Sequence, residues 1–82
     1  MARRVEPQPA LGRAIRRLRK ERDLSQEELG HLSEIHPTWI SHLESGRTNP
    51  SWGTMRRIAK VLDVRLSELV LLAERLAEDD DG

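Results

Sequence analysis

The sequence predicts an all-α fold, a compact bundle of five short helices. Apolar residues recur at helical spacing in several separate stretches, and no stretch alternates between apolar and polar residues as a half-buried strand does. Proline, glycine and capping residues divide the chain at short intervals, which keeps each helix short. A chain of 82 residues is long enough for one domain only. We place this domain at residues 10–77, between an N-terminal arm and an acidic tail.

The first helix is expected directly after the arm. Residues 1–9 contain two prolines and no apolar period, so they predict a flexible basic arm. After the arm, Leu11, Ile15 and Leu18 form one apolar stripe with Ala14 beside it, and arginines occupy the outer face. This pattern is typical of an amphipathic helix that lies on a core.

The second helix has the strongest local start signal in the chain. Ser25 is followed three residues later by Glu28, the spacing of a capping box, in which each side chain accepts a hydrogen bond from the backbone of the other residue. The helix is therefore expected to run from Gln26 to Ser33. A helix cannot continue through Pro37, but proline suits the first turn of a new helix.

The third helix is accordingly expected over Pro37–Ser45, with Gly46 as its left-handed C-terminal cap. Only residues 34–36 connect the second helix to the third, and two helices so closely joined must cross steeply, as in a helix-turn-helix unit. In such a unit the latter of the two helices, here the third helix of the chain, enters the major groove of DNA with its amino-terminal half.

Two further helices complete the expected fold. Ser51 can cap a fourth helix, and a fifth is expected from Leu66 to Ala77. Residues 78–82 are acidic and are expected to form a disordered tail. Net charge is zero, but residues 1–22 carry eight arginines and lysines against two glutamates, and residues 78–82 carry four acidic side chains. Because the two charges are separated along the chain, a net charge of zero does not exclude a nucleic-acid partner.

The stretch from Leu11 to Leu72 resembles the Cro-repressor type (Xre) helix-turn-helix family. The resemblance is carried by many positions at fixed spacings, none of them specific alone. These positions are Ser25-Gln26, Leu29, Ile35, Ile40-Ser41, Leu43-Glu44, Gly46, Asn49-Pro50-Ser51 and Ile58-Ala59. The family implies a λ-repressor-like fold whose third helix is the recognition helix.

The resemblance also implies roles for individual residues. The residues expected to face the bases are His36, Pro37, Thr38, Ser41 and His42. Those expected on the phosphates are Ser25, Gln26, Trp39, Arg47, Thr48, Asn49 and Arg13. Arg19 and Glu44 match a pair that forms a structural ion pair in the family.

The chain departs from the family pattern at several positions. Gly30 stands where a small residue such as alanine is usual, and glycine lowers helix propensity by about 1 kcal/mol. Glu34 stands where the turn is often glycine, so either the turn is strained or it takes another shape. Trp39 packs either on the sugar-phosphate backbone or beside Trp52 to close the domain.

The fifth helix is apolar around most of its circumference, which predicts burial on more than one side. We predict a homodimer and assign the interface to Leu69, Leu71, Leu72 and Leu76. The alternative is that Leu71 and Leu72 fold back onto the first helix or the arm. A two-fold dimer would place two recognition helices about 34 Å apart, one turn of DNA.

Other classes of protein lack support in the sequence. The three histidines, His31, His36 and His42, do not stack on one helical face, and the chain has no cysteine, so we expect no metal and no cofactor. We expect no enzyme and no small-molecule substrate, because no nucleophile and base are paired around a substrate cleft. No membrane-spanning stretch and no signal peptide is recognisable, so a cytoplasmic location is expected.

The function predicted from the sequence is that of a homodimeric transcriptional regulator that reads a palindromic site in double-stranded DNA. Two alternatives remain open at this point. One is the antitoxin of a toxin–antitoxin pair, which would bind a toxin as well as DNA. The other is a helical protein-interaction module without DNA binding.

Overall fold

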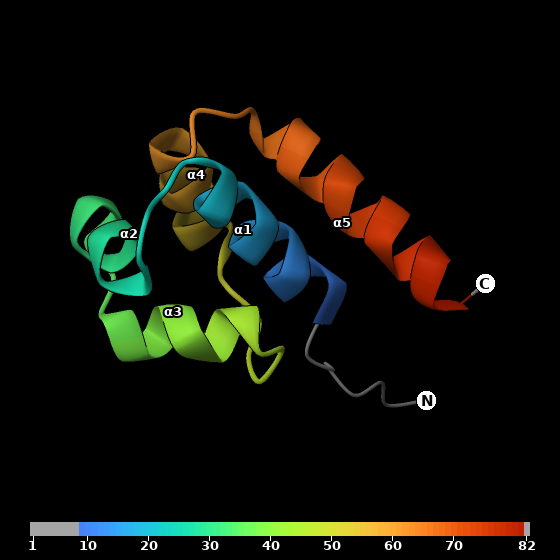
Figure 1. Cartoon of the computed structure of the whole chain (residues 1–82), viewed down its shortest axis with the longest axis horizontal. Coiled ribbons are helices and arrows are strands. Elements are labelled where there is room, and N and C mark those ends of the chain that lie inside the picture. Colours follow the sequence, from blue (N-terminus) through green and yellow to red (C-terminus); the bar gives the residue numbers. More distant parts are fainter. Residues whose placement is uncertain (1–8, 82) are drawn as a thin grey trace.

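The computed structural model describes residues 9–81, which form five α-helices (Figure 1). The helices are α1 (Pro9–Glu21), α2 (Gln26–Ser33), α3 (Pro37–Glu44), α4 (Trp52–Val61) and α5 (Leu66–Asp81). The prediction of an all-α bundle of five helices is confirmed. The predicted bounds of α2 agree with the structure, and α3 ends one residue earlier than expected, with Ser45 as its C-cap.

Helix α1 packs between α5 and α3. It makes its most extensive contact with α5 and also packs against α3, while α2 contacts α3 and α4. Figure 1 shows α1 in the middle of the molecule and α3 along its lower edge, with α5 extending to one side. The side of α3 that faces away from α1 is consequently at the surface.

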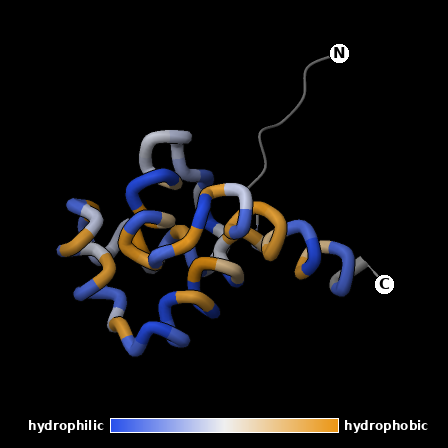
Figure 2. The backbone as a smooth tube through the Cα atoms, turned by 90° about the horizontal axis from the view of Figure 1, so that it is seen from above, coloured by the Kyte–Doolittle hydropathy of each residue, from blue (hydrophilic) through white to orange (hydrophobic). Residues whose placement is uncertain are grey.

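The core takes apolar side chains from every helix. The largest of those that are completely buried are Ile15, Leu29, Ile40, Leu43, Ile58, Leu62 and Leu69. Burial of each such side chain contributes about 1.5–3 kcal/mol. Leu11 and Leu18 of the predicted first stripe are only partly buried but pack against this core. Along the helices hydrophobic and hydrophilic stretches alternate, as expected for helices with one buried face (Figure 2).

Two predicted boundaries are wrong. Pro9, which we assigned to the arm, is the first residue of α1, because proline has the φ angle of a helix and its missing N–H needs no acceptor in the first turn. The rest of the predicted arm, residues 1–8, lies outside the described residues. At the other end, α5 does not stop at Ala77 but continues to Asp81. No glycine or proline interrupts residues 66–81, so the helix continues into the segment that we expected to be a disordered tail.

Helices α1 to α4 all end in the same way. Each is followed by a residue with positive φ, whose N–H and the next N–H both donate to carbonyls of the last helical turn, as in a Schellman motif. The four residues with positive φ are Asp23 (54°), Glu34 (60°), Gly46 (75°) and Asp63 (57°). Three of these four ends therefore hold a non-glycine residue in the left-handed region, which its Cβ disfavours.

Candidate nucleic-acid interface

The amino end of α2 is closed by the capping box that the sequence predicted. The Glu28 N–H donates to Ser25 Oγ at 3.0 Å, and the Ser25 N–H donates to Glu28 Oε1 at 2.9 Å. The hydrogen bond from the Ser25 backbone, reinforced by the Ser25 hydroxyl, holds the pKa of Glu28 below its ordinary value. Ser25, a predicted phosphate contact, thus uses its hydroxyl oxygen as the acceptor that caps α2.

The turn between α2 and α3 brings two backbone segments into close contact. Glu34 adopts the left-handed conformation, and the Ile35 N–H donates to the Gly30 carbonyl at 2.8 Å. A Cβ at Gly30 would lie 2.5 Å from the Ile35 carbonyl oxygen and 3.2 Å from the Pro37 nitrogen. The glycine that departs from the family pattern is therefore required here by the close approach of the turn, and an alanine would not fit without movement of the backbone.

Helix α3 begins at Pro37 with His36 as its N-cap. The ring nitrogen Nδ1 of His36 accepts a hydrogen bond from the Thr38 N–H at 3.1 Å. His36 was predicted to face the bases, but in this structure one of its two ring nitrogens caps the helix. The other nitrogen, Nε2, is the atom with which His36 can make a further contact.

The predicted base-facing residues of α3 lie together on its outer side. Thr38 is exposed, and Ser41 and His42, at spacings of three and four residues, are half-buried. Within residues 9–81 the hydroxyls of Thr38 and Ser41 make no hydrogen bond. Trp39 is 42% exposed, and its ring lies edge-on to that of His42 with centroids 6.0 Å apart.

Trp52 is 65% exposed, so neither tryptophan is part of the core. Of the two alternatives for Trp39, packing beside Trp52 to close the domain is not observed.

The loop after α3 places a cation beside the end of that helix. Gly46 adopts φ of 75°, and the Arg47 N–H donates to the His42 carbonyl at 2.9 Å. The Arg47 side chain is exposed, while Thr48 and Asn49 are half-buried. Three predicted phosphate contacts thus follow directly on α3, and of these Arg47 is the exposed one.

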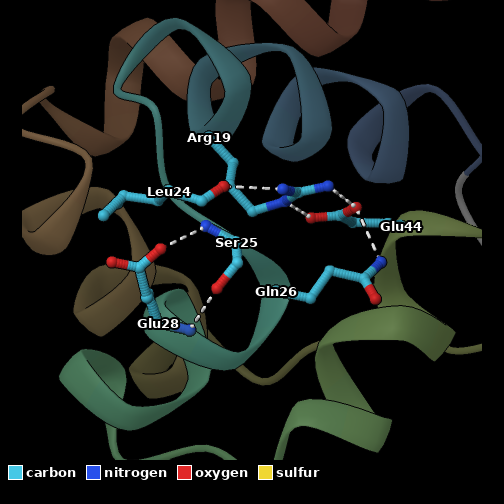
Figure 3. Close-up of polar contacts among 6 residues, drawn as sticks. All are labelled: Arg19, Leu24, Ser25, Gln26, Glu28 and Glu44. Atoms are coloured by element: carbon cyan, nitrogen blue, oxygen red, sulfur yellow. Dashed lines mark hydrogen bonds and ion pairs between the residues drawn. The ribbon is translucent and has the colours of Figure 1, made fainter.

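Arg19 and Glu44 form the predicted ion pair, which is buried (Figure 3). Arg19 Nε and Nη2 donate to the two carboxylate oxygens of Glu44 at 2.7 and 3.0 Å, and Arg19 Nη1 donates to the Leu24 carbonyl at 2.7 Å. The pair joins α1, the α1–α2 connection and the carboxyl end of α3. Glu44 also accepts a hydrogen bond from Gln26, a contact that the sequence did not reveal.

The structure does not bring Arg13 to the outer side of α3. Its guanidinium Nη2 donates to the Leu76 carbonyl of α5 at 3.5 Å. Gly12 and Arg19, which face α3, are seven residues apart and share one side of α1. Arg13, Arg17 and Lys20 instead line a groove toward α5, about a quarter turn around the helix.

The predicted dimer residues of α5 separate into two groups. Leu69 is completely buried and Leu76 is 9% exposed, since both pack into the core of their own chain. Their assignment to a dimer interface is therefore wrong. Leu71 is 48% exposed and Leu72 is half-buried. Val70, which follows Leu69 in the sequence, is 36% exposed and lies next to Leu71 at the surface.

Other kinds of site have no counterpart in the part of the chain that the structure describes. Residues 9–81 contain no cluster of three or more side chains that could hold a metal ion. None of the five described helices is long and apolar enough to cross a membrane.

A comparison with protein families matches residues 10–77 to a helix-turn-helix domain. The chain therefore belongs to this family, the Xre-type helix-turn-helix proteins, which are DNA-binding transcriptional regulators and not enzymes. Control proteins of restriction–modification systems are among its relatives. The λ-repressor-like fold is likewise confirmed by the likeness to solved repressor domains.

Individual relatives cover most of the chain. The competence pilus inhibition repressor of Acinetobacter baylyi is 35% identical over 72 residues, which are 88% of this chain and 64% of that protein. The chain thus spans slightly less than two thirds of the length of this repressor. The structure of the clp gene regulator ClgR from Corynebacterium glutamicum superposes with a TM-score of 0.83 at 25% identity, over 90% of this chain and 80% of that one. SinR in complex with DNA superposes with a TM-score of 0.70 at 31% identity, over 73% of this chain and 97% of that one.

Proposed function

We propose that this protein is a homodimeric regulator that reads a short, roughly palindromic operator in double-stranded DNA and acts in the cytoplasm. The observation that carries the proposal is the outer side of α3, where Thr38 and Ser41 present hydroxyls that the fold does not use. A hydroxyl can donate to or accept from the edge of a base, and the methyl group of Thr38 suits contact with thymine. This chemistry supports α3 as the element that distinguishes sequences.

Groups suited to phosphate lie beside the same helix. The Arg47 guanidinium is exposed directly after α3, and the Gln26 amide lies at the amino end of α2, next to Glu44 of α3. Phosphate contacts set the register of a protein on the duplex but carry no sequence information themselves. SinR, which shares the fold over nearly all of its crystallised chain, was solved with DNA bound. We carry over to this chain only the class of ligand, double-stranded DNA.

The dimer is proposed through the exposed side of α5. Val70 and Leu71 are adjacent apolar residues that are 36% and 48% exposed, and Leu72 beside them is half-buried. An apolar patch that the domain leaves uncovered favours contact with a second copy. A two-fold axis there would place the two α3 helices on successive turns of one DNA face, about 34 Å apart.

Selection from a random duplex pool tests the proposal. We expect enrichment of an inverted repeat with half-site centres about 10 base pairs apart. Thr38→Ala and Ser41→Ala are each expected to reduce the preference for the selected sequence over a scrambled one. A pool without any enriched motif, combined with weak binding at low salt, contradicts DNA reading and favours the protein-interaction alternative.

A salt titration on the selected duplex separates phosphate contacts from base contacts. Arg47→Ala is expected to weaken binding to every sequence and to reduce the slope of log K against log salt by about 1 per protomer. Arg17→Ala is the matched control, since Arg17 is an exposed arginine on the α5 side of α1. Equal losses for the two variants would show that Arg47 makes no local contact with the DNA.

The dimer has its own test. Leu71→Glu places a charge in the exposed apolar patch and is expected to give a monomer in sedimentation equilibrium with an unchanged monomer fold by circular dichroism. A wild-type chain that is monomeric both alone and on the selected duplex contradicts the dimer but leaves the DNA proposal standing.

A further inference from the structure

The Glu44 carboxylate holds two side chains and not only its ion-pair partner. Besides the two bonds from Arg19, Glu44 Oε1 accepts a hydrogen bond from Gln26 Nε2 at 3.1 Å (Figure 3). The side chains of Glu44 and Arg19 are 3% and 9% exposed, so the carboxylate is shielded from water. Gln26, by contrast, is half-buried and reaches from the surface toward it.

This contact determines which end of the Gln26 amide meets Glu44. An ionised carboxylate only accepts hydrogen bonds, so the amide must turn its NH₂ group toward Glu44. One N–H of that group is used by Glu44 and the second remains available for another acceptor. Gln26 is also the first residue of α2, where the first backbone N–H groups have no acceptor within the helix. Ser25 takes the N–H of Glu28, which leaves those of residues 26 and 27 as additional donors at this end.

We propose that Glu44 is a positioning residue for DNA binding: it holds the Gln26 amide with its donor end in place, so that the second N–H can bind a phosphate oxygen. The inference rests on the proposed function, and it gives the buried ion pair a role beyond stability. A free glutamine side chain must give up rotational freedom when it binds. Because Glu44 holds the side chain beforehand, that loss is avoided, and we expect a gain in DNA affinity of about fivefold per protomer.

A double-mutant cycle tests the inference. The dissociation constant is measured at one low salt concentration for the wild type, Gln26→Ala, Glu44→Asp and the double variant. The probes are the selected operator and a mixed-sequence duplex of equal length, because a phosphate contact does not depend on sequence. Aspartate keeps the charge that Arg19 needs but withdraws the carboxylate from Gln26 by one methylene group. Thermal unfolding of each variant establishes that it is folded.

If Glu44 acts through Gln26, Glu44→Asp weakens binding about fivefold per protomer on both probes, and Gln26→Ala weakens it at least as much because it also removes the phosphate contact. The double variant is then no weaker than Gln26→Ala. A purely structural role of Glu44 predicts that the two losses multiply, and this result overturns the inference. A Gln26→Ala variant that binds as the wild type does also overturns it, while the proposed function stands. A wild-type chain that binds neither probe contradicts both.

Should Glu44→Asp fail to fold, the wild type provides a second test. The chain has two glutamines, Gln8 and Gln26, and one asparagine, Asn49, so its NMR spectrum holds three side-chain amide groups. We expect the Gln26 amide to be rigid on the nanosecond timescale and to exchange its protons more slowly than in the urea-unfolded chain. An amide as mobile and as rapidly exchanging as in the unfolded chain shows that Glu44 does not hold it.

Discussion

Glu34 ends α2 with φ of 60° and ψ of 42°, a left-handed conformation in which its Cβ approaches the following carbonyl. For a residue other than glycine this conformation costs about 1–2 kcal/mol. Glycine is free of that cost, but its greater freedom in the unfolded chain offsets about 0.5–1 kcal/mol. The substitution Glu34→Gly is therefore expected to raise the free energy of unfolding by about 0.5–1 kcal/mol. For a domain of this size that corresponds to a rise in Tm of about 4 °C.

Thermal unfolding followed by circular dichroism measures this rise. Glu34→Ala is the matched control, because it removes the carboxylate but keeps the Cβ that causes the strain. Asp63→Gly, at φ of 57°, is expected to give a smaller gain, since aspartate adopts the left-handed region more readily than glutamate. If the glycine and alanine variants at position 34 unfold at the same temperature, the strain that we assign to this turn does not exist.

Three further predictions, each with its own variants, test the packing and the caps. Gly30→Ala is expected to destabilise the chain by about 1–2 kcal/mol in urea unfolding because its Cβ would meet the Ile35 carbonyl, whereas Gly53→Ala, with no atom within 4 Å, is expected to stabilise it by about 0.5–1 kcal/mol. The pKa of Glu28 is lowered in the folded chain, so the stability that its carboxylate contributes is present above the ordinary glutamate pKa and is lost as the pH falls through the folded pKa. In Glu28→Gln this part of the decrease in the free energy of unfolding at acidic pH is expected to disappear. Leu69→Ala is expected to cost about 2–5 kcal/mol and Leu71→Ala less than about 0.5 kcal/mol when both are measured as monomers, and equal losses would show that α5 faces the core differently.

The sequence predicted the helix-turn-helix unit well because its signals there are local. Ser25 and Glu28 specify where α2 begins, and Pro37 specifies where α3 begins, in each case through interactions within a few residues. The resemblance to the family added the pairing of Arg19 with Glu44, which lie 25 residues apart and which no local pattern joins. The structure confirms that pair.

The errors and omissions concern features that depend on tertiary packing or on local effects that oppose one another. Periodicity shows that α5 is apolar on several sides, but it does not show which side meets α1, so Leu69 and Leu76, which are buried, were assigned to the dimer interface. After Ala77 the absence of glycine and proline favours continuation of the helix, whereas acidic residues are unfavourable at its carboxyl end. The prediction gave more weight to the acidic residues and therefore ended α5 too early. The hydrogen bond between Gln26 and Glu44 requires the carboxyl end of α3 to lie beside the amino end of α2, which only the folded chain shows.

The two glycines that lie inside α1 and α2 explain how α3 is held. A Cβ at Gly12 of α1 would collide with the carbonyl oxygens of Leu43 and Glu44 at the carboxyl end of α3, and one at Gly30 of α2 would collide with the Ile35 carbonyl just before its amino end. Glycine inside a helix costs about 1 kcal/mol relative to alanine, so neither residue serves its own helix. Each instead permits a backbone approach that a side chain would prevent, and together the two approaches hold α3 at both ends. Because α3 is only eight residues long, fixing both of its ends determines its direction, and the hydroxyls of Thr38 and Ser41 are thereby presented at defined positions on the outer surface.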